Sequence, residues 1–133
     1  MFAGIYDSTV DDTERYVFTD AAKKMQPYVQ DEQLGYIFRL TKALAEVMEL
    51  KFDLGVRTRR AYNAGDKQEL KNLANNVYPM VAERVEKLYR TLREQYYIEN
   101  KPNGFEIQDA RLGGLIHRLE ACRKKIEDYV VGK

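Results

Sequence analysis

Apolar residues return every three or four positions along almost the whole chain, and this spacing restricts the fold to amphipathic helices. The longest such run consists of Leu34, Ile37, Phe38, Thr41, Leu44, Val47, Met48, Lys51, Leu54, Gly55, Thr58, Ala61 and Tyr62. Because residues three and four apart share one side of a helix, the run predicts one helix of about 30 residues, or about 45 Å. Asp31 is placed to cap its start and Gly65 to end it.

A shorter helix is predicted before this run and a long one after it. Asp11 or Asp12 can cap the first of these helices, and Pro27 is expected to end or kink it. Asp66 is placed to cap the second. Pro79 lies inside that second pattern, so we expect a kink there or two abutting helices.

The last predicted helix follows a loop over residues 100–104 and ends at Gly132. Its apolar side is made by Leu112, Leu115, Ile116, Leu119, Cys122, Ile126, Tyr129 and Val130. Together the patterns predict an all-α fold, an antiparallel helical bundle of three long helices plus a shorter N-terminal helix. The 133 residues suit one domain. We expect residues 1–10 to be an extended segment that leads into a single helical-bundle domain over residues 11–133.

Positive and negative charges nearly cancel, with 22 Lys and Arg against 21 Asp and Glu and a net charge of +1. A chain with so small a net charge has no overall field that attracts nucleic acid or a membrane, so we expect neither as a partner. No apolar run approaches the roughly 18 residues of a membrane span, and the N-terminus lacks the basic region of a signal peptide. The expected compartment is therefore the cytoplasm.

Residues able to carry catalysis are few and scattered. His117 has no serine or cysteine partner at a recognisable spacing. Cys122 falls on the apolar side of the last helix, where a thiol behaves as a small hydrophobic group. Asp31 and Glu32 precede an apolar run, where acidic residues serve as caps. We therefore expect no catalytic residue, no cofactor and no metal site in this chain.

The stretch over residues 100–114 reads NKPNGFEIQDARLGG and differs from the helices around it. A plain connection between helices needs about two to eight mostly polar residues. This stretch instead combines apolar and charged side chains, which are the two chemistries of interface hot spots. Asp109 is also placed to cap the last helix, with Phe105 as the apolar anchor and Arg111 as the polar one. The residues expected to contact a partner are Lys101, Phe105, Glu106, Asp109 and Arg111.

Two further sets of residues stand out along the chain. Asp53 and Arg57 lie four residues apart, a spacing that fits either an exposed salt bridge or a buried polar network. Gly55, Gly113 and Gly114 lie in or beside apolar helix faces, where each glycine costs roughly 1 kcal/mol relative to alanine. The usual reason for such a glycine is the close approach of another backbone, and we expect close packing at all three.

Two long stretches of the chain carry a resemblance to a known family. They read LKFDLGVRTRRAYNAGD at residues 50–66 and ENKPNGFEIQDARLGGLIHRLEACRKKIEDYVVGK at residues 99–133. Both are similar to the C-terminal helical domain of bacterial exo-β-N-acetylhexosaminidases of glycoside hydrolase family 20. The opening MFAGIYD looks like the segment that follows the catalytic barrel in those enzymes. The resemblance thus extends over nearly the whole chain.

The resemblance implies that this chain is a fragment of a larger glycosidase. Family members release terminal β-linked N-acetylhexosamine with retention, through attack by the substrate's acetamido group, which an aspartate holds beside an acid/base glutamate. The pair Asp31 and Glu32 lacks the family's His-x-Gly-x lead-in, so these roles are not carried over to it. A barrel needs about 200 residues or more. We expect this chain alone to be inactive and to pack on the catalytic barrel, on a second subunit as a homodimer, or on both.

Two other functions remain open from the sequence. One is a small helical-bundle enzyme of the chorismate mutase type, in which Arg57, Arg60 and Arg111 would hold a dicarboxylate. A polar pocket in the core of the bundle would favour it. The other is a stand-alone interaction module that binds a partner helix through a tyrosine-bearing surface, since the chain has ten tyrosines.

Overall fold

The computed structural model describes residues 15–99 and 105–133, and within these ranges the chain is helical and contains no strand. The elements are α1 (Arg15–Met25), a 3-10 turn (Gln26–Tyr28), α2 (Gly35–Lys51), α3 (Leu54–Asn63), α4 (Lys67–Asn72), a π-helical segment (Leu73–Val77), α5 (Tyr78–Ile98) and α6 (Phe105–Val130). The extended segment predicted over residues 1–10 and the caps predicted at Asp11 and Asp12 lie outside the described residues.

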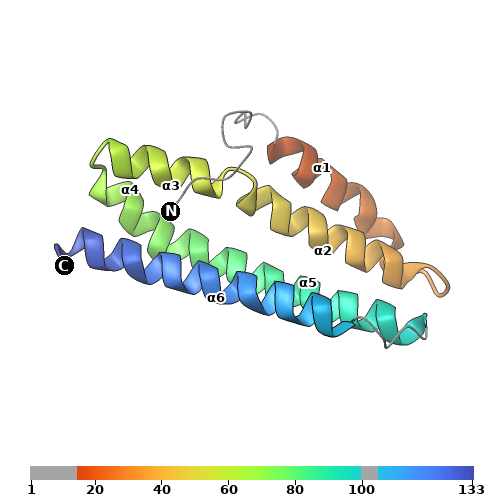
Figure 1. The fold of residues 1–133 in the computed structure, drawn as a ribbon. Helices are drawn as coiled ribbons and strands as arrows, with labels where there is room; N and C mark the ends of the chain where they lie inside the picture. The colour runs from red at the N-terminus through yellow and green to blue at the C-terminus, as the bar shows by residue number, and fades with distance from the viewer. Residues whose placement is uncertain (1–14, 100–104) are drawn as a thin grey trace.

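The helices pack in series, with α1 on α2, α2 on α5 and α5 on α6. Helices that are neighbours in this series run in opposite directions (Figure 1). The predicted all-α antiparallel bundle is therefore confirmed. Its three long helices are α2 with α3, α4 with α5, and α6, while α1 is the shorter N-terminal helix.

The hydrophobic core is shared by α2, α3, α4, the π-helical segment, α5 and α6. Val81 and Val85 on α5 and Leu73 just before it are completely buried, at 0% exposed. A buried Leu or Val side chain contributes about 1.5–3 kcal/mol relative to an exposed one, so these residues dominate the stability of the domain. The other core residues are Ala43, Val47, Leu54, Ala61, Leu70, Ala74, Tyr78, Leu88, Leu119 and Ile126.

The long helix predicted after Asp31 is interrupted, because α2 ends at Lys51 and α3 begins at Leu54. Both residues at the break contact α1. The ring of Phe52 lies 5.4 Å from that of Phe18, and the carboxylate of Asp53 forms a 3.0 Å ion pair with Arg15. The prediction of one uninterrupted helix was therefore wrong here, and the break coincides with contacts to α1.

The apolar stripe read from the sequence of α2 does not face the core along its whole length. Leu34, Ile37 and Leu44 are 50%, 38% and 49% exposed. Ala43 and Ala45 are buried instead, on the sides of α2 that meet α5 and α1. These small side chains let neighbouring helices approach closely, and the larger side chains are left outside.

The predicted helix ends are largely confirmed. Gly65 has φ +66°, and the amides of Gly65 and Asp66 donate to the carbonyls of Tyr62 and Ala61, which is a Schellman end. The carboxylate of Asp66 accepts from the amide of Glu69 at 3.0 Å and caps α4. Gly132, with φ +83°, ends α6 in the same way as Gly65 ends α3.

The two prolines with described neighbours also act as expected. Pro27 lies in the 3-10 turn directly after α1. Pro79 lies in the first turn of α5, where its missing amide is not needed. The π-helical segment Leu73–Val77 comes immediately before it, so the interruption expected inside this long helix is confirmed. Asp31 caps the turn before α2 rather than α2 itself, accepting from the amides of Gln33 and Leu34.

We predict that Leu73→Ala lowers the free energy of unfolding by about 2–5 kcal/mol, because it removes a completely buried side chain. Leu44→Ala is the matched control, and its loss in the 133-residue chain should stay within about 0.5 kcal/mol because Leu44 is half exposed. Urea denaturation of both variants measures the difference. Equal losses would contradict the register of α2 described above.

Candidate functional site

The end of α5 and the start of α6 come together at the stretch that the sequence singled out. Phe105, the first residue of α6, has its ring 5.6 Å from Tyr89 and 5.3 Å from Tyr96 on α5. It is half buried by these contacts. The predicted apolar anchor thus packs within the chain and attaches α6 to α5.

Asp109 lies five residues into α6, inside the helix, so it does not cap that helix as predicted. Its carboxylate accepts a hydrogen bond from the hydroxyl of Tyr89, and this bond raises the pKa of Tyr89 above its ordinary value. The nearby guanidinium of Arg93 acts in the opposite direction and lowers it. Asp109 therefore links α6 to α5 at the same place as Phe105.

Arg93 and Tyr97 continue this face of α5 toward its end. The guanidinium of Arg93 lies 5.6 Å from the centre of the Tyr97 ring. A hydrogen bond to the Tyr97 hydroxyl raises the pKa of Arg93. This pair was not predicted from the sequence, although the spacing of four residues between Tyr89, Arg93 and Tyr97 places all three on one side of a helix. Tyr97 is 64% exposed and offers an aromatic surface.

Of the other residues expected to contact a partner, two are exposed on α6 and one lies outside the described residues. Glu106 and Arg111 are exposed on α6, and Lys101 lies outside the described residues. Gly113 and Gly114 are half buried, and a Cβ atom at either would meet no described atom within 4 Å. The described part of the chain therefore does not supply close packing at these two glycines, and close packing there stays a prediction. Gly55 is half buried in the first turn of α3.

Asp53 and Arg57 take part in two separate ion pairs. Asp53 binds Arg15 of α1 at 3.0 Å, with its side chain 7% exposed. Arg57 binds Glu69 of α4 at 3.0 Å. Asp53 and Arg57 do not pair with each other, although they lie four residues apart. Asp53 connects the start of α3 to α1, and Arg57 connects α3 to α4.

The groups considered for catalysis lie apart from one another. His117 is exposed on α6. Cys122 is a free thiol that is half buried against the core. The carboxylate of Asp31 accepts backbone hydrogen bonds from Leu34 and Gln33, which hold its pKa below the ordinary value, while Glu32 beside it is exposed. These contacts agree with a capping role for Asp31.

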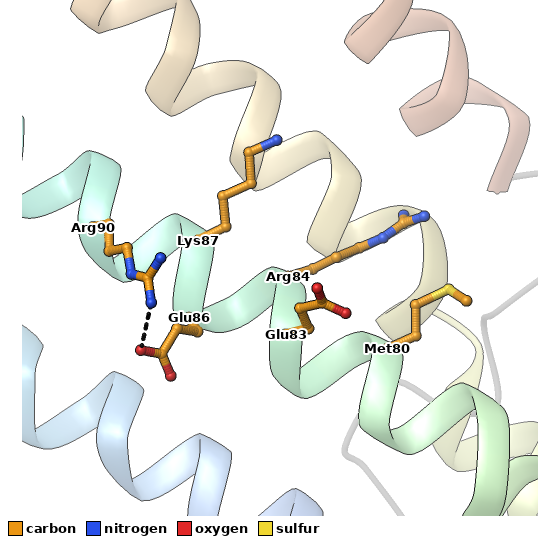
Figure 2. A pocket seen from close by; sticks show the side chains of 6 residues that line it. All are labelled: Met80, Glu83, Arg84, Glu86, Lys87 and Arg90. Carbon is orange, nitrogen blue, oxygen red and sulfur yellow. Dashed lines mark hydrogen bonds and ion pairs between the residues drawn. The ribbon is translucent and has the colours of Figure 1, made fainter.

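A shallow hollow of about 470 Å³ lies along the outer face of α5, where mostly charged side chains project between α2 and α6 (Figure 2). Arg90 binds Glu86 at 3.4 Å within the helix. Lys87 reaches Glu46 on α2 at 3.2 Å. Because these charges have protein partners, the hollow is a solvated, paired surface. The residues that line it are Met80, Glu83, Arg84, Glu86, Lys87 and Arg90.

Glu46 is the centre of the charged contact between α2 and α5. Burial disfavours its charged form, but hydrogen bonds and charges from Lys42 and Lys87 outweigh burial and lower its pKa. Lys42 lies 2.7 Å from the carboxylate. Arg84 donates to the backbone oxygen of Glu46 at 2.6 Å. These contacts stabilise the packing of α5 on α2.

Among the residues that the structure describes, no cluster of His, Cys, Asp or Glu is arranged to hold a metal ion. No helix in those same ranges is both long and apolar enough to cross a membrane.

By its fold, the chain is an all-α helical domain. Around its apolar core, the surface carries paired charges and several exposed apolar side chains. The model of the family named Glycoside Hydrolase 20C C-terminal domain matches residues 1–133, and the chain belongs to this family. The resemblance to the C-terminal domain of a family 20 hexosaminidase is thereby confirmed. Membership implies attachment to the catalytic domain of a parent enzyme. Among curated proteins, none matches the chain.

We predict that Asp109→Ala returns the pKa of Tyr89 toward its ordinary value of 10.0, because the accepting carboxylate is removed. Tyrosine ring carbons labelled with 13C allow the titration of Tyr89 to be followed by NMR. Tyr16→Phe is the control, since Tyr16 lies on α1 and is not among the groups that shift Tyr89. An unchanged Tyr89 titration in Asp109→Ala would contradict the link between α5 and α6.

We predict that the charged carboxylate of Glu46 stabilises the domain at neutral pH and that this contribution is lost in acid. Its pKa is lowered in the folded state, so its contribution is present above the ordinary value of 4.5 and is lost as the pH falls below it. Glu46→Gln should cost at most about 1 kcal/mol at pH 7, as is usual for partly exposed ion pairs. In urea denaturation, the difference from the unmodified chain should shrink toward pH 3. A constant difference would show that the charge of Glu46 has no such role.

Proposed function

We propose that this chain is a non-catalytic C-terminal domain that packs on the catalytic domain of its parent glycosidase. The parent, on this proposal, releases terminal β-linked N-acetylhexosamine. The observation that carries the proposal is the family match over residues 1–133. The attached catalytic domain hydrolyses the sugar linkage, and the helical domain supplies a surface on which the catalytic domain docks.

The outward side of the start of α6 supports a docking role. Ile107 is 52% exposed, and the exposed Arg111 follows it by one helical turn. Arginine is enriched among the residues that contribute most to binding at protein interfaces, and Ile107 adds exposed apolar surface beside it. Phe105, which packs on α5, holds this part of α6 in place.

The two glycines in α6 support the same role. Glycine inside a helix costs roughly 1 kcal/mol relative to alanine. At Gly113 and Gly114, no described atom lies where a side chain would be. The space beside them is therefore available to the backbone of a partner. Contact with such a partner would explain why glycine occupies both positions, which the described part of the chain does not explain.

The geometry gives less support to an enzyme of the chorismate mutase type. Arg57 is paired with Glu69, Arg60 is exposed on α3 and Arg111 is exposed on α6. The hollow on α5 contains none of these three arginines. An interaction module that is not part of a glycosidase would share the exposed surface, and the identity of the bound partner separates that function from docking on the catalytic domain.

We predict opposite effects of Gly114→Leu in the free domain and in the full parent enzyme. In the 133-residue chain, the change should raise stability by up to about 1 kcal/mol, because leucine favours helix more than glycine does. In the full enzyme, the same side chain should block the approach of the partner and lower the melting temperature. Calorimetry of both proteins measures the two effects. Gln68→Leu adds a leucine at an exposed position of α4 and is the matched control.

Arg111→Ala tests the polar contact in the same full enzyme and should weaken docking without unfolding the domain. Phe105→Ala is expected to destabilise the domain itself, because it removes the contacts with Tyr89 and Tyr96. If Gly114→Leu and Arg111→Ala leave melting temperature, oligomeric state and activity of the full enzyme unchanged, docking through the start of α6 is ruled out.

A further inference from the structure

An uncovered apolar stripe runs along α2. Its members are spaced three, four, three and four residues apart, which is the spacing of a seam between two packed helices. Leu34, Ile37 and Leu44 are 50%, 38% and 49% exposed, Thr41 is exposed and Met48 is half buried. We call these five residues the α2 stripe.

The other sides of α2 are already occupied. α1 and α5 both pack against it, and Ala43, Ala45 and Val47 are buried there. The helix is therefore apolar on the stripe as well as on its packed sides. Contiguous apolar surface that stays exposed on a helix marks a site for contact with another protein. The α2 stripe thus indicates a third neighbour, which the described residues do not include.

The one polar group in the stripe is already satisfied. The hydroxyl of Thr41 donates to the backbone oxygen of Ile37 at 2.9 Å, within the same helix. Covering Thr41 therefore leaves no donor without an acceptor, and its methyl group adds to the apolar surface. The stripe contains no charged side chain that would lose its hydration. It can be covered by an apolar surface at little electrostatic cost.

The length of the stripe argues against a second copy of the chain as the cover. From Leu34 to Met48 a helix rises about 21 Å, or about two heptads. A stable interface between separate proteins uses about 20–30 residues a side, far more than the five residues of the α2 stripe. A domain on the same polypeptide does not need so large a contact, because attachment gives it an effective concentration of about a millimolar.

We propose that the α2 stripe is covered by an apolar face of a helix in the catalytic domain of the same polypeptide. This inference rests on the proposed function, and it names a contact on α2 in addition to the start of α6. The spacing of the stripe selects a helix as the covering element. Leu44 and Ile37, near the middle of the stripe, make the central contacts.

Cysteine labelling of the full-length parent enzyme tests the contact. Three variants, Leu44→Cys, Val17→Cys and Ile107→Cys, place thiols on α2, α1 and α6 at positions that are 49%, 65% and 52% exposed in the domain. Reaction with a maleimide is followed by mass spectrometry of the peptides, so other cysteines do not interfere. The expected result is labelling at residue 44 at least about tenfold slower than at residue 17, at every protein concentration.

The remaining outcomes separate this inference from the proposed function. Fast labelling at residue 44 with slow labelling at residue 107 overturns the α2 contact but leaves docking through α6 standing. Labelling at all three positions as fast as in urea overturns both. Slow labelling at residue 44 that becomes fast on dilution identifies a second copy as the cover and also overturns the inference.

Discussion

The packing of α5 between α2 and α6 is the interaction on which the rest of the fold depends. Val81 and Val85 on α5 are completely buried, and they belong to the core that α2, α3 and α6 share. α1 is added to this arrangement through α2. Because the helices pack in series (Figure 1), those next to α5 keep outward sides that can receive another domain.

Charged and apolar groups are separated around α2. Glu46 points to α5, where Lys87 and Arg84 bind its carboxylate and its backbone oxygen. Leu44 lies two residues earlier, which on a helix is nearly the opposite side. The polar side is satisfied within the domain, and the apolar side is not. This asymmetry is what a domain needs if it folds on its own core and then docks on a larger protein.

Much of the fold could be predicted from residue spacing. The spacing of three and four residues predicted the helices, and Gly65 and Asp66 predicted an end and a start, because both act through local backbone contacts. The break at Asp53 could not be predicted from local spacing, since the residue that pairs with Asp53 there is Arg15, 38 residues away. Nor could the register of α2, because apolar residues lie on the α2 stripe as well as on the packed sides, and their spacing does not reveal which of these sides faces the core.

The contact at the start of α6 stays a prediction from the sequence, and the structure changes the role of one of its residues. Phe105, expected to be the apolar anchor for a partner, packs on Tyr89 and Tyr96 of α5. The residues of the α2 stripe were read from the sequence as part of one side of a long helix, and their exposure follows from the packing of α1 and α5 on the other sides of α2. Spacing identifies which residues share a side; the neighbours of the helix decide what that side contacts.

Hydrogen exchange in α2 tests most directly the claim that this domain folds by itself and docks through surfaces it leaves uncovered. The exchange of α2 amides is measured in the free 133-residue chain and in the full parent enzyme under the same conditions. The account predicts slower exchange over Gly35–Lys51 in the parent enzyme, because a further neighbour suppresses local opening of the helix. Equal exchange in the two proteins would contradict it.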